Sequence, residues 1–232
     1  MDTRIKRRTL MQLGGAAAAA AVTLQAAQAQ APASGPYQVK PLPFDPKSIK
    51  GLSEKILISH HDNNYAGAVK RLNAIAAQWA ALDVAKAPVF TINGLKREEL
   101  MAMNSMILHE VYFDSLGAGG NPTGALADAI VHDFGSLERW RAEFTAMGKA
   151  EGGGSGWVLL AWSPHDKRLV NQWAADHTNT VAGGRPILAL DMYEHAYHMD
   201  YGASAGGYVD AFMAAINWYN AGSLFTRYSG QA

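Results

Sequence analysis

Residues 191–197 read Asp-Met-Tyr-Glu-His-Ala-Tyr and directly follow the apolar run Pro186–Leu190. Asp191 and His195 are four positions apart where that run ends, so their side chains can face one centre. A carboxylate and an imidazole that converge suit a divalent or trivalent first-row metal ion. The stretch therefore indicates a metal site at the end of a buried segment.

Two more histidines, His60 and His109, each lie in an apolar segment with helical spacing. Taken singly, a histidine on such a face is more often a core or surface residue than a ligand. His61 follows His60, and adjacent side chains on a helix point about 100° apart, so both cannot easily bind one ion. With Asp191 and His195, the two histidines could form a shell of three imidazoles and one carboxylate.

The composition excludes several classes of protein and of site. Lys+Arg and Asp+Glu number 20 each, so the charge balance predicts no nucleic-acid partner. Cysteine is absent, which excludes thiolate ligands, cysteine nucleophiles and disulfides. After the first thirty residues no apolar run reaches about 18 residues, so we expect a soluble product without a membrane span.

The N-terminal segment 1–29 has the pattern of an export signal. Lys6-Arg7-Arg8 is basic and contains paired arginines, Leu13–Leu24 is apolar and rich in alanine, and Ala27-Gln28-Ala29 offers a cleavage site. Paired arginines are typical of the twin-arginine type, which predicts passage through that export machinery and a periplasmic product. A membrane anchor is the alternative, but the apolar run is short and its alanines are weakly lipophilic.

Proline, glycine and the apolar pattern divide the rest of the chain. Five prolines between Ala31 and Lys50 favour an extended leader, and Gly117–Pro122 marks a domain boundary. We therefore expect these regions: an export signal over 1–29, a leader over 30–50, a helical hairpin domain over 51–118, and an α/β domain over 119–232.

Helical spacing and short apolar runs predict the elements of these regions, and Ser136 is the expected N-cap of one helix. Helices are expected over 52–82, 96–116, 126–134, 137–149 and 207–220, and strands over 157–162, 169–174 and 187–191. Helices first, then a small sheet flanked by helices, predict the α+β class.

The spacing of the four candidate ligands, and the sequence around them, resembles the iron/manganese superoxide dismutase family. The resemblance covers nearly the whole chain after the signal. Its motifs are His60-His61 with the Val-x-x-Leu-Asn tail ending at Asn73, His109–Phe113, the Ala-Ile and Asp-Phe-Gly-Ser pieces of 129–136, Gly154–Trp157, Asp191–Tyr197, and Ile216–Trp218. A signature of this length with its companions in the family's order is a specific signal.

The resemblance implies the cofactor, the reaction and the fold. The metal ligands would be His60, His109, Asp191 and His195, with solvent as a fifth ligand to iron or manganese. The two metals accept the same ligands, so these residues do not distinguish them. The substrate would be superoxide, disproportionated to dioxygen and hydrogen peroxide. The implied fold is an N-terminal helical hairpin plus a C-terminal α/β domain with a three-stranded antiparallel sheet.

Several residues around the expected centre depart from the family pattern. Asn64 stands where a histidine is usual, Ala68 where a gateway tyrosine is usual, and Tyr193 where a tryptophan is usual. The family's glutamine that bonds the solvent ligand is absent at Ser105, and His177 falls near its alternative position. We predict that His177 takes this role, and that His177, Asn64 and Tyr193 are the catalytic side chains. A surface position is the alternative for His177.

The resemblance also implies a homodimer. Glu194 would bond the equivalent of His195 in the partner, and Tyr197 would lie at the same interface. Ala205-Gly206 replaces an arginine-proline pair, so anion steering is expected to be weaker. Tyr65 could supply a substitute for the missing gateway hydroxyl.

Two alternatives remain open from the sequence. Histidine and carboxylate shells also serve non-haem iron oxygenases and zinc hydrolases, although those sites leave more positions free of protein ligands. The chain could also be a metal-binding family member with weak or no dismutase activity, which Asn64, Ala68 and the missing arginine favour. The metal content would distinguish a superoxide dismutase from the first alternative. A rate of superoxide decay per bound metal would distinguish it from the second.

Overall fold

A computed structural model describes residues 35–230, so the predicted signal over 1–29 lies outside the described residues. Residues 35–50 contain no helix or strand. They are held to the helices that follow: the Tyr37 amide donates to Asn73 (3.0 Å) and the Lys40 amide to the Tyr65 hydroxyl (3.0 Å). Within the described residues no helix is long and apolar enough to cross a membrane.

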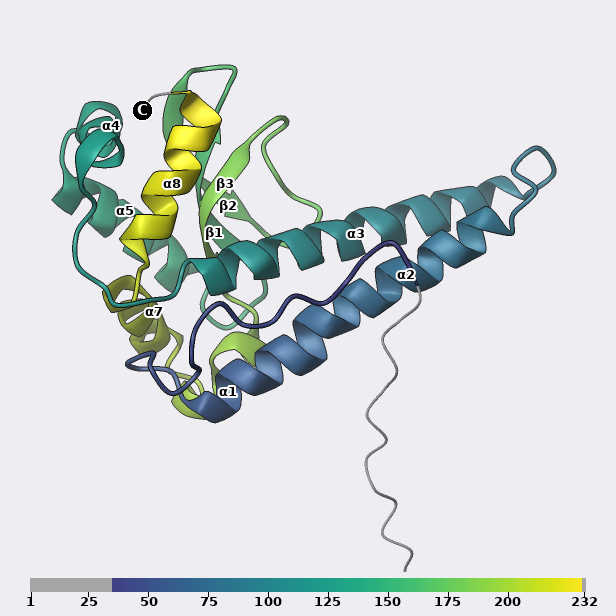
Figure 1. The fold of residues 1–232 in the computed structure, drawn as a ribbon, viewed down its shortest axis with the longest axis horizontal. Coiled ribbons are helices and arrows are strands. Elements are labelled where there is room, and N and C mark those ends of the chain that lie inside the picture. Colours follow the sequence, from purple (N-terminus) through teal and green to yellow (C-terminus); the bar gives the residue numbers. More distant parts are fainter. Residues whose placement is uncertain (1–34, 231–232) are drawn as a thin grey trace, which may run out of the picture. The chain divides into compact units, whose positions relative to one another are not determined.

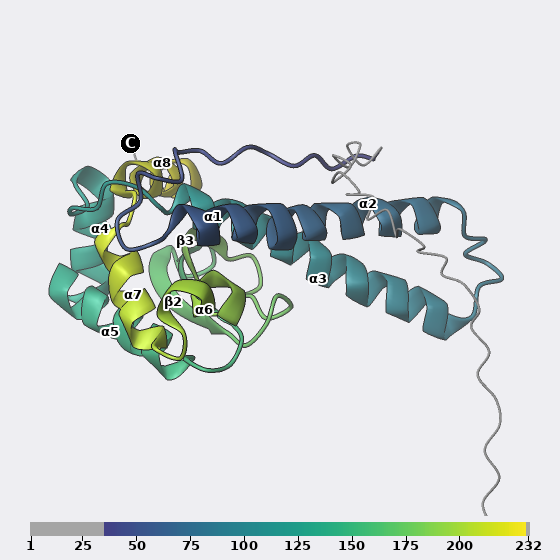
Figure 2. The ribbon, with the colours of Figure 1, turned by 90° about the horizontal axis from the view of Figure 1, so that it is seen from below.

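The first half of the described chain is a helical hairpin (Figure 1). Helix α1 covers Glu54–Ser59, α2 covers Ala66–Ala80 and α3 covers Val89–Asp114. Helices α2 and α3 pack side by side, as both views show (Figure 1, Figure 2). Their apolar residues recur at helical spacing, so each helix buries one stripe against the other or the second half.

Two features of the hairpin differ from the prediction. Helix α3 begins at Val89 and not near residue 96, because Pro88 starts the first turn and the exposed Val89 and Phe90 hide the apolar pattern there. The segment His60–Tyr65 between α1 and α2 is a π-helix, labelled η1. A π turn holds one residue more than an α turn, so it changes the direction of side chains where a candidate ligand lies.

The second half contains a three-stranded antiparallel sheet, as predicted. Strands β1 (Trp157–Ser163), β2 (Arg168–Ala174) and β3 (Arg185–Asp191) pair in the order β2-β1-β3. In the register, Trp157 lies opposite both Ala174 and Asp191. Every residue of the central strand β1 is buried, which explains its continuous apolar run. The start of β1 and the end of β3 therefore lie side by side at the same end of the sheet.

Helices and short helical turns precede and follow this sheet in the chain, and some of them pack on it. They are α4 (Gly124–Phe134), α5 (Leu137–Ala150), the 3₁₀ turn η2 (Glu194–Ala196), α6 (His198–Tyr201), α7 (Ala205–Ala214) and α8 (Trp218–Ser229). Helix α3 packs on β3, and α5 and α8 pack on β1. Ser136 caps α5 as predicted, because its hydroxyl accepts the Arg139 amide. The α+β class is confirmed, while the division of the chain into domains at residue 118 stays a prediction.

The prediction of a single last helix over 207–220 was wrong. The chain leaves the helical path between α7 and α8, where Ile216 forms a β-bridge with Leu116. The Asn217 amide donates to the Ser115 carbonyl (2.7 Å), and the Asn217 side chain then caps α8 by accepting the Asn220 amide. Pairing with a distant segment thus interrupts a sequence that is helical by local spacing.

Candidate metal centre

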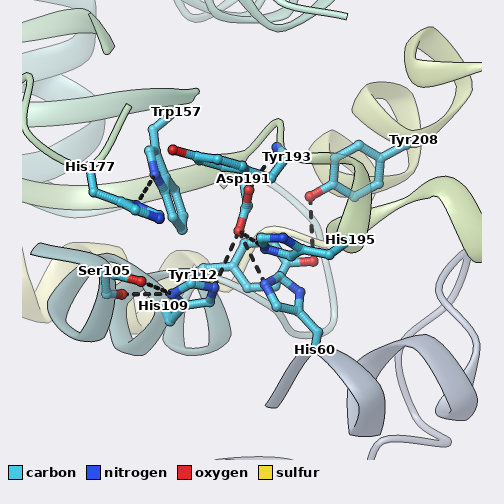
Figure 3. Close-up of polar contacts among 10 residues, drawn as sticks. All are labelled: His60, Ser105, His109, Tyr112, Trp157, His177, Asp191, Tyr193, His195 and Tyr208. Atoms are coloured by element: carbon cyan, nitrogen blue, oxygen red, sulfur yellow. Dashed lines mark hydrogen bonds and ion pairs between the residues drawn. The ribbon is translucent and has the colours of Figure 1, made fainter. Parts of the chain in front are cut away.

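Four side chains from four separate elements meet where η1, α3 and the end of β3 approach each other (Figure 3). His60 comes from η1, His109 from α3, Asp191 from the last position of β3, and His195 from η2. Their candidate ligand atoms all lie within 4.8 Å of one another. The structure therefore brings together the four residues that the sequence singled out.

One oxygen of Asp191 lies close to one ring nitrogen of each of the three histidines. Asp191 Oδ2 lies 3.1 Å from His60 Nε2, 3.1 Å from His195 Nε2 and 3.6 Å from His109 Nε2. His109 Nδ1 donates to the Ser105 carbonyl at 2.6 Å, as the dashed lines of Figure 3 indicate. This bond puts the proton of the neutral ring on Nδ1 and leaves the Nε2 lone pair facing the carboxylate.

Burial controls the charge of these groups. It lowers the pKa of His60, and it lowers the pKa of His109 to about 3, so both imidazoles are neutral at ordinary pH. Burial alone would raise the pKa of Asp191, but the charge of His195 and hydrogen bonds from His195 and His60 hold that pKa well below its usual range. The centre thus combines one buried carboxylate with two neutral imidazoles, those of His60 and His109.

Such a donor set fits a metal cation. His109 Nε2 is buried without a hydrogen-bond partner among the described residues, and its lone pair is directed at a carboxylate oxygen. Leaving such a group buried and unpaired is costly, whereas a cation between the lone pairs and the carboxylate would satisfy all of them. Imidazole nitrogens with a single carboxylate suit iron, manganese and zinc.

Aromatic rings enclose the centre. The His60 ring lies 4.8 Å from Tyr112 and 5.2 Å from Phe113, and the His109 ring lies 5.3 Å from Trp157. Tyr112 and Phe113 are buried, and Trp157 is fully buried. These rings keep water away from most of the cluster and hold the imidazoles in fixed orientations.

His177 lies beside this centre and not on the open surface. The Trp157 indole N–H donates to His177 Nδ1 at 3.0 Å, and the His177 ring lies 6.1 Å from the His109 ring. Its other nitrogen is on the side of the ring that faces the cluster (Figure 3). Tyr193 stacks on His177 with ring centres 4.8 Å apart and on His195 at 5.4 Å. Burial lowers the pKa of His177.

Of the other predicted positions, Asn64 and Ala68 lie beside the centre, whereas the Tyr65 hydroxyl is bound elsewhere. Asn64 and Ala68 line a cavity that also reaches Ser105 and His177. The Tyr65 hydroxyl instead donates to Glu110 at 2.9 Å and accepts the Lys40 amide. The idea that Tyr65 replaces the gateway hydroxyl is therefore wrong, because that hydroxyl is engaged with other groups.

The two predicted dimer residues differ in exposure. Glu194 is exposed, and the neighbouring His195 side chain remains 25% exposed. Tyr197 is only 2% exposed and stacks on Tyr208 with ring centres 5.3 Å apart. Its own chain thus covers most of the Tyr197 side chain. Glu194 and Tyr197 both stay predicted interface residues.

Sequence reasoning missed the roles of Trp157 and Ser105 in orienting histidines. Trp157 was noted as part of a motif, but its indole N–H fixes which nitrogen of His177 carries the proton. The Ser105 carbonyl does the same for His109. Because the second contact is to a backbone carbonyl, which any residue type supplies, the identity of residue 105 gave no signal for it.

Comparisons with known proteins agree with this centre. Residues 122–223 match the family described as iron/manganese superoxide dismutases, C-terminal domain. The "Superoxide dismutase [Fe]" of Cupriavidus metallidurans is 70% identical over 189 residues, which cover 82% of this chain and 96% of that relative. The "Superoxide dismutase [Mn] 1" of Halobacterium salinarum is 38% identical over 186 residues, covering 78% and 91%. The "Superoxide dismutase [Fe]" of Pyrobaculum aerophilum is 30% identical over 188 residues, covering 78% and 88%. With relatives at this identity matched over most of their length, the chain belongs to the iron/manganese superoxide dismutase family.

Proposed function

We propose that this protein disproportionates superoxide at a mononuclear iron or manganese site held by His60, His109, Asp191 and His195. The observation that carries the proposal is the group of four ligand atoms within 4.8 Å, three of them on buried residues, in which His109 Nε2 has no hydrogen-bond partner among residues 35–230. The relative from Cupriavidus metallidurans is named for this activity with iron, and others are named for it with manganese.

The ion, when bound, supplies a one-electron couple that takes an electron from one superoxide and returns it to another. The protein's part is to set the charge and the proton supply around that couple. The neutral imidazoles of His60 and His109 add no charge, so the single negative charge of Asp191 would offset part of the charge of the ion. Superoxide and protons are consumed in equal number as dioxygen and hydrogen peroxide form, so a proton donor is needed at the centre.

His177 is suited to hold that proton. Because His177 Nδ1 accepts from Trp157, the neutral ring carries its proton on the other nitrogen, Nε2. The Tyr193 ring stacks on His177 and keeps it from turning. We therefore infer that His177 donates from Nε2 toward the centre, with Trp157 and Tyr193 as positioning residues.

The alternative within the same family is a metal-binding protein with weak or no turnover. Asn64 and Ala68 favour this alternative, because neither supplies the titratable side chain that the sequence comparison led us to expect there. Ala205 and Gly206, which stand where the resemblance implies an arginine-proline pair, also favour it. A rate constant per bound ion separates the two functions.

We also propose export and dimerisation, each on a narrower basis. The pattern of residues 1–29 supports twin-arginine export to the periplasm. The exposed Glu194 next to the partly exposed His195 supports a homodimer in which Glu194 bonds the partner's last histidine ligand. The proposed homodimer is tested by comparing wild type with Glu194→Ala. The molecular mass in solution and the metal content of both proteins would be measured.

Elemental analysis and a superoxide assay on the same purified sample test the proposed function. We expect bound iron or manganese and rapid superoxide decay. His60→Ala should lose both, while His177→Ala should keep the metal and slow the reaction about 10²- to 10⁴-fold if it supplies the proton. His165→Ala is the matched control, because the His165 side chain is 92% exposed. Zinc in native material, or metal without turnover, would contradict the proposal.

A further inference from the structure

A cavity of about 280 Å³ lies beside the metal centre, between η1, α2 and α3. Its lining includes Ser105, which is 8% exposed and whose carbonyl bonds His109, and His177, whose ring lies 6.1 Å from His109. Ala68 contributes a small side chain to the lining and leaves the space open. The cavity therefore connects solvent with the side of the centre where the predicted proton donor lies.

Arg71 is the only residue of this lining with a permanent charge. The others are small, apolar or neutral polar residues, apart from His177, whose pKa is lowered by burial. The Arg71 side chain is 58% exposed, so the guanidinium stands at the solvent end. A single cation at the mouth of a cavity with protein walls attracts anions toward its interior.

The ion pair of Arg71 is loose and does not remove this field. Arg71 Nη1 lies 3.3 Å from Glu98, whose side chain is 47% exposed, and no acidic residue of the described chain lines the cavity. Exposed pairs of this kind are weak, so solvent and small anions compete with them. Glu98 itself does not line the cavity, but its negative charge opposes the attraction by Arg71.

We propose that Arg71 attracts and orients the small anionic substrate in this cavity, and that Glu98 moderates the attraction. The inference rests on the proposed function, since superoxide is the anion concerned. It assigns to α2 the positive charge that the residues Ala205 and Gly206 do not provide. The alternative is that Arg71 is simply a solvated surface residue. In that case neither the charge of Arg71 nor that of Glu98 would affect the reaction.

Removing the positive charge of Arg71 and removing the negative charge of Glu98 should have opposite effects on the rate. Arg71→Gln should lower the second-order rate of superoxide decay per bound ion about two- to fivefold at low ionic strength, and Glu98→Gln should raise it by a similar factor. Arg71→Lys should keep most of the wild-type rate. Both differences should vanish near 0.5 M salt, where charges more than a few ångströms apart are screened.

The experiment is stopped-flow decay of superoxide between about 10 mM and 500 mM ionic strength, on metal-loaded wild type and the variants. Arg227→Gln, at an exposed position of α8, is the control for a change of net charge and should match wild type. Equal rates for wild type, Arg71→Gln and Glu98→Gln at low salt would overturn the proposal. A defect of Arg71→Gln that persists at high salt would also overturn it, because the role would then be structural.

Azide, a small monovalent anion, gives a readout that does not depend on turnover. Its affinity for the metal-loaded protein, followed by absorbance, should fall in Arg71→Gln and rise in Glu98→Gln. If wild type lacked dismutase activity but azide affinity still changed in this way in the two variants, the proposed function would be refuted. The role of Arg71 in anion binding would still be supported. Active wild type with unchanged azide affinity and rate in both variants would refute the role of Arg71 alone.

Discussion

Replacing Glu151 by glutamine should make the protein more stable, and the gain should grow as the pH rises. Glu151 follows α5 and is only 7% exposed, and neither carboxylate oxygen has a hydrogen-bond partner among the described residues. Gly156 packs against it so closely that an added Cβ would lie 2.8 Å from Glu151 Oε1. Burial, and next the charge of Asp191, raises the pKa of Glu151 from 4.5 to about 8.

The size of the effect follows from these two pKa values. The folded protein holds the Glu151 proton up to about pH 8, whereas the unfolded chain releases it near pH 4.5. The stability contributed by the neutral acid is therefore complete below pH 4.5 and is lost as the pH rises to 8. At roughly 1.4 kcal/mol per pH unit, the cost is about 2 kcal/mol at pH 6 and about 4.5 kcal/mol at pH 8.5. These are upper limits, because a cation at Asp191 would offset part of the repulsion.

The assay is urea unfolding of metal-loaded wild type and Glu151→Gln at several pH values from 6 to 9. Glutamine resembles the neutral acid, so the difference in free energy of unfolding should rise with pH by up to about 2.5 kcal/mol between pH 6 and pH 8.5. Glu54→Gln is the control, since the Glu54 side chain is 45% exposed. A difference that is independent of pH would refute the argument, because Glu151 would then carry the same charge in both states.

Gly148→Ala on α5 should destabilise the protein by about 1–3 kcal/mol in thermal or urea unfolding, because the new methyl would lie 2.8 Å from the Leu190 side chain. Gly222→Ala on α8 is the matched control, since no atom lies within 4 Å, and it should be neutral or slightly stabilising; equal loss in both variants would contradict the packing argument. Trp157→Phe removes the donor that fixes the His177 tautomer, so the pH profile of the superoxide rate should shift while bound metal is retained. An unchanged profile would show that His177 does not act through that bond.

Much of the fold could be predicted because its elements are locally encoded. The strands are short apolar runs between turn residues, and their predicted limits differ from the observed ones by at most two residues. The break between α7 and α8 could not be found in this way, since it depends on pairing of Ile216 with the distant Leu116. The π-helix at His60 likewise has no simple signature in residue spacing.

The candidate site was predictable in its ligands and less so in its surroundings. His60, His109, Asp191 and His195 could be proposed because family motifs place them, although they are far apart in the sequence. The burial of Tyr197 by its own chain, with its ring stacked on Tyr208, was not predicted. Contacts of this kind depend on how elements pack, which spacing along one segment does not report.

Anomalous X-ray diffraction from crystals of the native protein, measured at the iron, manganese and zinc absorption edges, tests the central claim most directly. We expect one strong peak at the iron or manganese edge, about 2 Å from the ligand atoms of His60, His109, Asp191 and His195. A peak at the zinc edge alone, or an ion bound by other residues, would contradict the account.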